Sequence, residues 1–534
     1  MRLPLRLLTA AIMLLLAAPA QAEWWEAETG HFVVKSRDSE EGTLEFALEL
    51  ERLDAALRTL LNLPVGVPEQ SRSNKLNVYR FGSDRDIARM AGAPGSGIAG
   101  FYIAYAGQSV AFAPARQRIN NSIRTRDRRG RIDELAVLKH EYIHFFMMQH
   151  FPAAYPRWYV EGYAEMMSTI YYKEDNVFHV GDPPQHRAYQ VLEMSQSPLE
   201  EMLDSNHRLE GMDSIQHYGT GWQLSHYLNF NPDRLAQLHE FLVALGNGED
   251  SLTAARRIFG DLNAMDEELR RYRREAFPGY DVRLADVNIT DVTMRQLSPA
   301  EEDLIREEMR LRRGIGDEDD AADVLADARS NAADYPGNPH ALLILALAEY
   351  EAENYAEADA LAAQLTEQDP ENIEALLIRT ASAIDRIEDD PSQAEEARSY
   401  ASYAAAIDRA DPRPLILYYY SYLEAGEEPP EAAVIALEAA FETSGSDPTY
   451  RILLARQLVV ENRLQSASTV LQPIAFRGHN QGDDEEEEEL AEGETPEPSL
   501  TKLLRLITNG ERDSALAMMD EMMEDEEDEE DGEA

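Results

Sequence analysis

The chain has 534 residues, which is too long for one ordinary domain and predicts about two to four. It contains no cysteine, so disulfide bonds, thiol catalysis, cysteine-ligated zinc and lipid attachment at an N-terminal cysteine are excluded. The net charge of −51 is uneven, with −8 in residues 1–300 and −43 in residues 301–534. Because an acidic surface repels nucleic acid and anionic lipid, we expect neither as a partner of the C-terminal half.

Residues 1–22 have the pattern of a signal peptide. Arg2 and Arg6 precede an apolar run at 7–18, and residues 20–22 form an A-x-A cleavage site. The apolar run is shorter than the ~20 residues that a membrane-spanning helix needs, and no later run is long enough. We therefore expect an exported, periplasmic protein with no transmembrane segment after cleavage before Glu23.

The next part of the chain predicts an α+β fold. Strands are expected at 31–35 and 76–81, helices at 44–61 and 83–90, and a β-hairpin at 101–112, which together make a small sheet. Seven arginines then lie between Arg116 and Arg131. We interpret this arginine cluster as a solvated loop, one that could dock on the acidic half; a phosphate or lipid site is the less favoured alternative.

The motif His140-Glu141-Tyr142-Ile143-His144 is predicted to lie on a buried helix from about Asp133 to His150. Histidines four residues apart project from one face of a helix and can share one metal ion. His150 lies on another face and is expected to be structural.

A second helix, opened by Pro156, is expected to carry Glu161 and Glu165 on one face. A peptidase zinc site needs three protein ligands and one open position. His140, His144 and Glu161 are the expected ligands, with Glu161 favoured over Glu165. Glu141 is then placed to act as general base, and Glu165 to accept a hydrogen bond from a ligating imidazole.

HExxH followed by Trp158-Tyr159-Val160-Glu161-Gly162-Tyr163-Ala164-Glu165 resembles the gluzincin zinc metallopeptidases, most closely the bacterial peptidase-MA-like proteins. The resemblance implies an α+β catalytic domain, placed at residues 23–300, with Glu161 as third ligand and Glu165 beside the ligands. It does not imply aminopeptidase specificity, because that substrate motif is absent. Tyr218 resembles a Tyr that opens a later helix and could stabilise the oxyanion. The alternative is that His217 and Tyr218, or Ser214, pack and cap the helix running to Leu228.

From residue 301 the composition changes to Ala, Leu and Glu with helical spacing. Ala341-Leu342-Leu343-Ile344 recurs 34 residues later at 375–378, a period typical of tetratricopeptide repeats. We expect an all-α tetratricopeptide-like solenoid at 301–475, with an irregular helical bundle as the alternative. An acidic disordered linker is expected at 476–498, an additional helical pair at 499–523 and an acidic tail at 524–534.

Two functions remain open from the sequence. The favoured one is an exported zinc metallopeptidase that hydrolyses peptide bonds of envelope proteins or peptides, with repeats that bind a protein substrate or partner. The alternative is an envelope assembly or chaperone scaffold that acts through its repeats, with an inert or structural zinc site.

Overall fold

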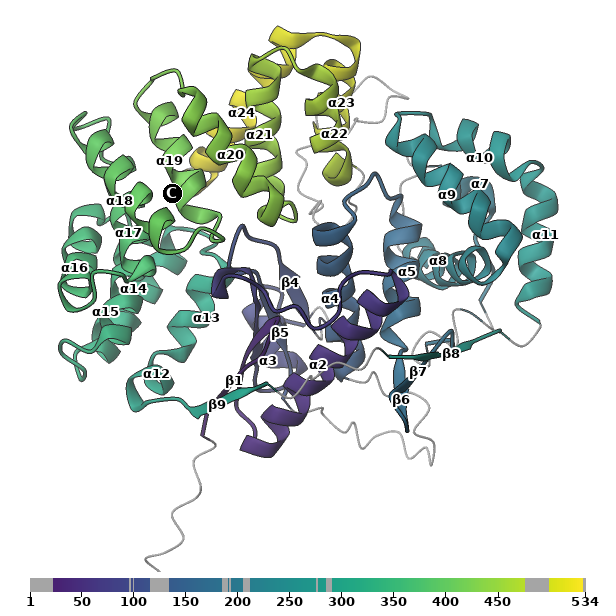
Figure 1. Cartoon of the computed structure of the whole chain (residues 1–534), viewed down its shortest axis with the longest axis horizontal. Helices are drawn as coiled ribbons and strands as arrows, with labels where there is room; N and C mark the ends of the chain where they lie inside the picture. Colours follow the sequence, from purple (N-terminus) through teal and green to yellow (C-terminus); the bar gives the residue numbers. More distant parts are fainter. Residues whose placement is uncertain are drawn as a thin grey trace, which may run out of the picture.

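The structure is a computed structural model. It describes residues 23–95, 98, 100–115, 134–184, 191, 194–204, 212–274, 277–284, 291–475 and 499–531. The signal sequence, the arginine cluster and the acidic linker at 476–498 lie outside the described residues. Most of the described chain is helical, with one mixed sheet and a smaller antiparallel one (Figure 1).

The larger sheet has six strands in the order β4-β5-β3-β2-β1-β9. Strands β2, β3 and β5 are parallel, and the remaining pairs are antiparallel. The bounds are β1 Trp25–Glu28, β2 Phe32–Ser36, β3 Leu76–Arg80, β4 Phe101–Ile103, β5 Val110–Ala113 and β9 Thr293–Gln296. The hairpin expected at 101–112 is β4 and β5. The sheet has two strands more than the sequence predicted, because β1 forms just before β2 and β9 joins from a position after the candidate site.

Alternate residues of these strands face two different cores. Val34, Val78 and Ala111 are paired across three strands and face the core that contains α4 and α5. Tyr79 and Phe112 point to the other side, where the apolar cluster includes Ile305 and Met309. Because side chains alternate along a strand, one sheet holds the candidate site on one face and a C-terminal helix on the other.

The site face is covered by α2 Glu40–Leu60, α4 Glu134–His150 and α5 Arg157–Ser168, and α8 Met212–Phe230 crosses α5. The other elements of this part are α3 Asp84–Met90, α7 Leu199–Leu203, α9 Pro232–Gly246, α10 Ser251–Phe259, α11 Leu262–Tyr272 and the three-stranded sheet of β6 Tyr171–Lys173, β7 Val177–Val180 and β8 Tyr280–Arg283. The helices α7, α9, α10 and α11 and the second sheet were not predicted from the sequence, whereas a helix running to Leu228 was expected and corresponds to α8.

The C-terminal helices pack one after another along the chain. They are α12 Pro299–Asp303, α13 Ile305–Arg313, α14 Glu318–Ala332, α15 Pro339–Glu351, α16 Tyr355–Gln368, α17 Ile373–Ile384, α18 Gln393–Ile407, α19 Arg413–Glu424, α20 Glu431–Ser444, α21 Pro448–Val460, α22 Leu464–Ala475, α23 Ser499–Asn509 and α24 Arg512–Asp531. The 34-residue repeat corresponds to α15 and α17, whose capping residues Asn338 and Asn372 bond the backbone N–H groups of their first turns. This arrangement is consistent with a helical repeat region.

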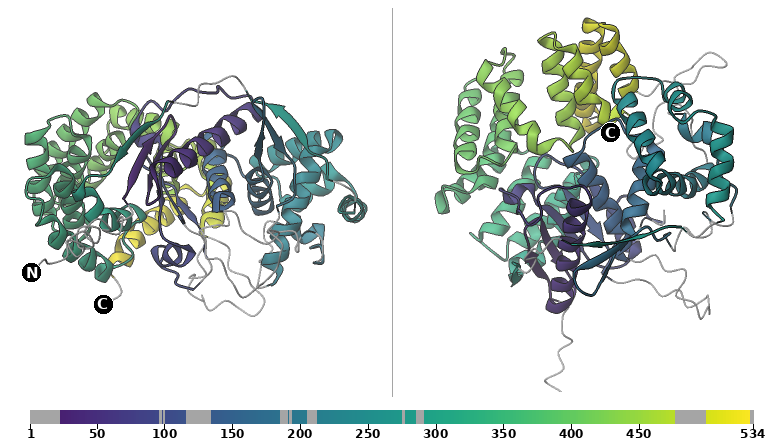
Figure 2. Two further views of the ribbon diagram at one scale, coloured as in Figure 1. Left: turned by 90° about the horizontal axis from the view of Figure 1, so that it is seen from below. Right: turned by 45° about the vertical axis from the view of Figure 1, so that its right-hand side comes forward.

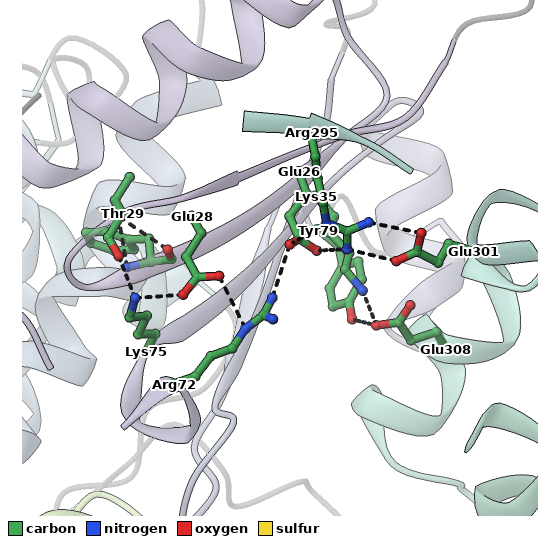
Figure 3. Close-up of polar contacts among 11 residues, drawn as sticks. Glu26, Glu28, Thr29, Lys35, Arg72, Lys75, Tyr79, Arg295, Glu301 and Glu308 are labelled. Atoms are coloured by element: carbon green, nitrogen blue, oxygen red, sulfur yellow. Dashed lines mark hydrogen bonds and ion pairs between the residues drawn. The ribbon is translucent and has the colours of Figure 1, made fainter. Parts of the chain in front are cut away.

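The C-terminal helices form an arc that begins beside the sheet and ends over α4 (Figures 1 and 2). Ionic contacts, some buried and some partly exposed, hold the beginning of the arc (Figure 3). Glu308 of α13 accepts hydrogen bonds from Lys35 on β2 and from Tyr79 on β3. Arg295 on β9 contacts both Glu26 and Glu301. No helix in the described ranges is long and apolar enough to cross a membrane.

Candidate metal centre

The helix α4 presents the two motif histidines on one side and is anchored through the other. The His140 and His144 rings are 4.6 Å apart between centroids and nearly perpendicular. Between them in sequence, Tyr142 is buried on the opposite side, where its ring packs on Phe32 and its hydroxyl donates to Asp54 of α2. The orientation of the histidines is therefore fixed by the packing of Tyr142 against α2 and β2.

Glu161 is placed by the close crossing of α5 and α8. A Cβ atom at Gly162 would lie 2.2 Å from the carbonyl oxygen of Gly221, so the backbones touch where α5 meets α8. No larger residue fits this crossing. Glu161 is adjacent to Gly162 and 2 % exposed, and the crossing directs its carboxylate toward α4.

Three donor atoms converge at this point. The Nε2 atoms of His140 and His144 are 3.0 Å apart, and Oε2 of Glu161 lies 3.3 Å from the first and 3.8 Å from the second. Zinc bonds of 2.0–2.1 Å at tetrahedral angles place neighbouring ligand atoms about 3.3 Å apart. The two imidazoles and one carboxylate therefore fit a zinc ion in both donor type and spacing.

The charges around His140 favour a cation. Burial by itself lowers the pKa of the His140 imidazole, but the hydrogen bond that it donates to Glu161 and the charges of Glu165, Glu161 and Glu141 raise the pKa to about 9. Glu165 is 1 % exposed and lies one turn beyond Glu161 on the same helix. The charge of the Glu165 carboxylate contributes to the raised pKa of His140.

A cavity of about 520 Å³ opens beside these groups. Glu141, His144 and Glu161 all line it, so the general-base candidate and two of the candidate ligands face the same space. The remaining wall is mostly apolar and comes from β4, α4, α5, α21 and α22; it includes Phe101, Ile103, Met147, Met148, Val160 and Pro473. The size is that of an ordinary small-ligand pocket.

Two other residues named from the sequence lie elsewhere. Tyr218 is half-buried in the second turn of α8, and it is not among the described residues that line the cavity. The prediction that a helix opens at 217–218, or is capped at Ser214, is wrong because α8 begins at Met212. His150 packs on Phe146 with its Nε2 3.4 Å from Arg58, and burial and that guanidinium lower its pKa to about 4.

A second group of potential ligands, not predicted from the sequence, is formed by His31, Glu51 and Asp54. Nδ1 of His31 lies 2.9 Å from Glu51, and Nε2 lies 2.9 Å from the carbonyl oxygen of Val67. Both partners only accept hydrogen bonds, so both ring nitrogens carry hydrogens. Glu51 and Asp54 raise the pKa of His31 against the effect of burial, which lowers it. This group is an ion-pair cluster that holds α2, and through Asp54 it reaches Tyr142.

The missed cluster has a weak signal in the sequence. Glu51, Asp54 and Arg58 are charged residues on the otherwise apolar inner face of α2, and Arg58 donates to both oxygens of Asp54. Charged residues on a buried helix face require partners. That pattern indicates a buried polar network, although it does not indicate which helix the network supports.

No family model and no curated protein matches the chain. Among solved structures, one chain that matches is described as "MamA RS-1 ArsTM double mutant". It is 17% identical, the match covers 33% of this chain and 93% of that one, and the TM-score is 0.26. A TM-score this low supports no conclusion about fold or function.

Proposed function

We propose that this protein is a zinc-dependent metallopeptidase of the gluzincin type. The observation that carries the proposal is the convergence of His140, His144 and Glu161 at distances of 3.0–3.8 Å, beside a cavity that Glu141 also lines. A purely structural zinc site is closed by four protein ligands, whereas a catalytic site keeps one position open. Three ligands next to a cavity therefore favour catalysis over the scaffold alternative.

Each residue of the site would have a distinct role in peptide hydrolysis. His140, His144 and Glu161 would hold the ion, and zinc when bound supplies a Lewis acid that polarises a carbonyl and lowers the pKa of water. Glu141 would accept a proton from the attacking water and deliver it to the leaving amine. Glu165 would hold an imidazole in the tautomer that leaves Nε2 for the metal. An exported enzyme of this kind would act on envelope proteins or peptides.

The test uses the full chain with Glu141→Gln, which keeps every ligand. We expect about one zinc per chain in both wild-type and variant protein by metal analysis, and loss of peptide hydrolysis only in the variant. Glu201→Gln is the matched control, because Glu201 is exposed on α7 away from the cavity.

Absence of zinc from the Glu141→Gln protein would contradict the site assignment. In a strain that lacks the protein, complementation by Glu141→Gln would favour the scaffold alternative. Failure of that variant alone, with Glu201→Gln active, would favour the enzyme.

A further inference from the structure

The cavity has two walls from distant parts of the sequence. One wall is formed by β4, α4 and α5, which carry the candidate metal ligands. The other is formed by Asp447, Pro448 and Thr449 at the start of α21 and by Pro473 in α22. Figure 1 shows α22 above the upper end of α4, with α21 beside α22. The repeat region therefore forms part of the cavity.

One short segment, residues 443–449, joins the two edges of the cavity; we call it the bridging segment. The carbonyl oxygen of Thr443 accepts a hydrogen bond of 3.1 Å from Gln149 at the end of α4. Asp447 Oδ2 accepts one of 2.7 Å from the backbone N–H of Ala106, in the turn between β4 and β5. Its Oδ1 caps α21 through the N–H of Thr449. Asp447 is 4 % exposed, so both bonds are shielded from water.

The β4–β5 turn is held from three further helices. Tyr105 donates to the carbonyl oxygen of Arg313 at the end of α13, and Gln108 donates to Glu374 on α17. Glu374 is also paired with Arg413 on α19, whose side chain lies against Gly107. Ala106 is buried in the apolar cluster of α19 to α24. Contacts at Tyr105, Ala106, Gly107 and Gln108 thus fix the turn. Because the turn continues into β4, they also fix the edge of the cavity that β4 forms relative to α4.

The size of the cavity limits what can enter. The cavity volume of about 520 Å³ is that of a small-ligand site, which has room for a few side chains but not for a folded domain. Its lining is mostly apolar, and Arg157 is the only Lys or Arg among the described lining residues. Apolar side chains of a few residues of extended polypeptide match this lining in size and polarity. The surface of a folded protein does not, because it is too large to enter the cavity.

We propose that the bridging segment is a fixed wall of the site, so that the site accepts short peptides or extended segments of unfolded polypeptide and excludes folded proteins. The inference deepens the proposed function and rests on it for the chemistry that follows binding. It adds a role for the repeat region in the site itself to the expectation that the repeats bind a protein substrate or partner.

The first test measures binding in zinc-loaded Glu141→Gln protein, so that turnover is not needed. The probes are a short fluorescent peptide with apolar side chains, and a small disulfide-linked protein in its folded form and in its reduced, alkylated form. Thr449→Trp places an indole at the cavity wall, and we expect its Kd for the peptide to rise about tenfold with zinc content unchanged. Thr469→Trp is the matched control, since Thr469 is exposed on α22 and is not a lining residue.

The second test loosens the wall. Asp447→Asn keeps an oxygen for the cap but presents an amide N–H₂ to the N–H of Ala106. We expect faster hydrogen exchange at 101–108 and weaker peptide binding. Asp261→Asn, at the cap of α11, should change neither, because Asp261 bonds only backbone N–H groups of its own first turn in the described structure.

The inference is overturned if Thr449→Trp binds the peptide as tightly as its parent, or if the folded probe binds as tightly as the alkylated one. The proposed function fails separately. The wild-type protein could hydrolyse no peptide while zinc-loaded Glu141→Gln protein binds only the unfolded probe. That result would support the bridging segment as a wall of the site and would contradict the proposed peptidase activity.

Discussion

The close crossing of α5 and α8 gives the sharpest prediction. Gly162→Ala would place a methyl group 2.2 Å from the carbonyl oxygen of Gly221 and 2.4 Å from Oγ of Ser225. Non-bonded heavy atoms pack at more than 3 Å, so the two helices must separate by about 1 Å. Glu161 is the adjacent residue and moves with α5.

The displacement is large compared with what a metal site tolerates. Zinc–ligand distances hold to within about 0.2 Å, and disturbing the residues that support a ligand costs about 10–100-fold in metal affinity. We expect the Kd for zinc to rise at least about tenfold, and the free energy of unfolding to fall by an overpacking cost of about 1–3 kcal/mol, with a lower thermal midpoint. Competition with a chromophoric chelator measures the first quantity, and calorimetry measures the second.

Gly246→Ala is the matched control, because Gly246 ends α9 and a Cβ atom there meets nothing within 4 Å. It should bind zinc as the wild type does. If Gly162→Ala kept wild-type zinc affinity with its fold intact, the claim that this crossing positions Glu161 would be refuted.

Three further predictions follow from buried charges and from the cavity lining. Burial raises the pKa of Glu308, but Lys35 and neighbouring cations outweigh this effect and lower the pKa to about 2 in the folded protein. The ionised carboxylate therefore contributes about 3 kcal/mol of stability at pH values above its ordinary pKa of 4.5, and this contribution is lost as the pH falls toward 2. The thermal midpoint of Glu308→Gln should therefore vary less between pH 5 and pH 3 than that of the wild type. Tyr142→Phe leaves its ring in place but removes a donor to the buried Asp54, which should cost about 1–3 kcal/mol and lower zinc affinity; equal affinities would contradict the anchoring role of Tyr142. Arg157→Met should raise KM for peptides with a free terminal carboxylate more than for amidated ones, and an equal effect on both would exclude Arg157 as a carboxylate partner.

The two motif histidines show which part of the site can be predicted from residues close together in the sequence. Their spacing of four residues places them on one face of any helix, and α4 has the length that the apolar pattern indicated. Glu161 and Glu165 were both candidates for the third ligand, because both share a face of α5. Only the structure places Glu161 within 3.8 Å of both Nε2 atoms, since that distance depends on how α5 packs on α8.

The missed features share one physical cause. The helices α7, α9, α10 and α11 and the ion-pair cluster around His31 depend on contacts between elements, which no repeat or short motif encodes. The position of Tyr218 was misjudged because α8 begins six residues before it, and a helix start without a strong capping pattern is hard to place from sequence.

The sequence by itself determined the features that depend on neighbours along the chain. These are the pairing of His140 with His144 and the 34-residue repeat, whose asparagine caps each bond a first turn. The tertiary structure alone decided that the repeat region forms a wall of the cavity. That wall depends on a bond between Ala106 and Asp447, which are 341 residues apart, and contacts at such a separation are set by the packing of whole elements.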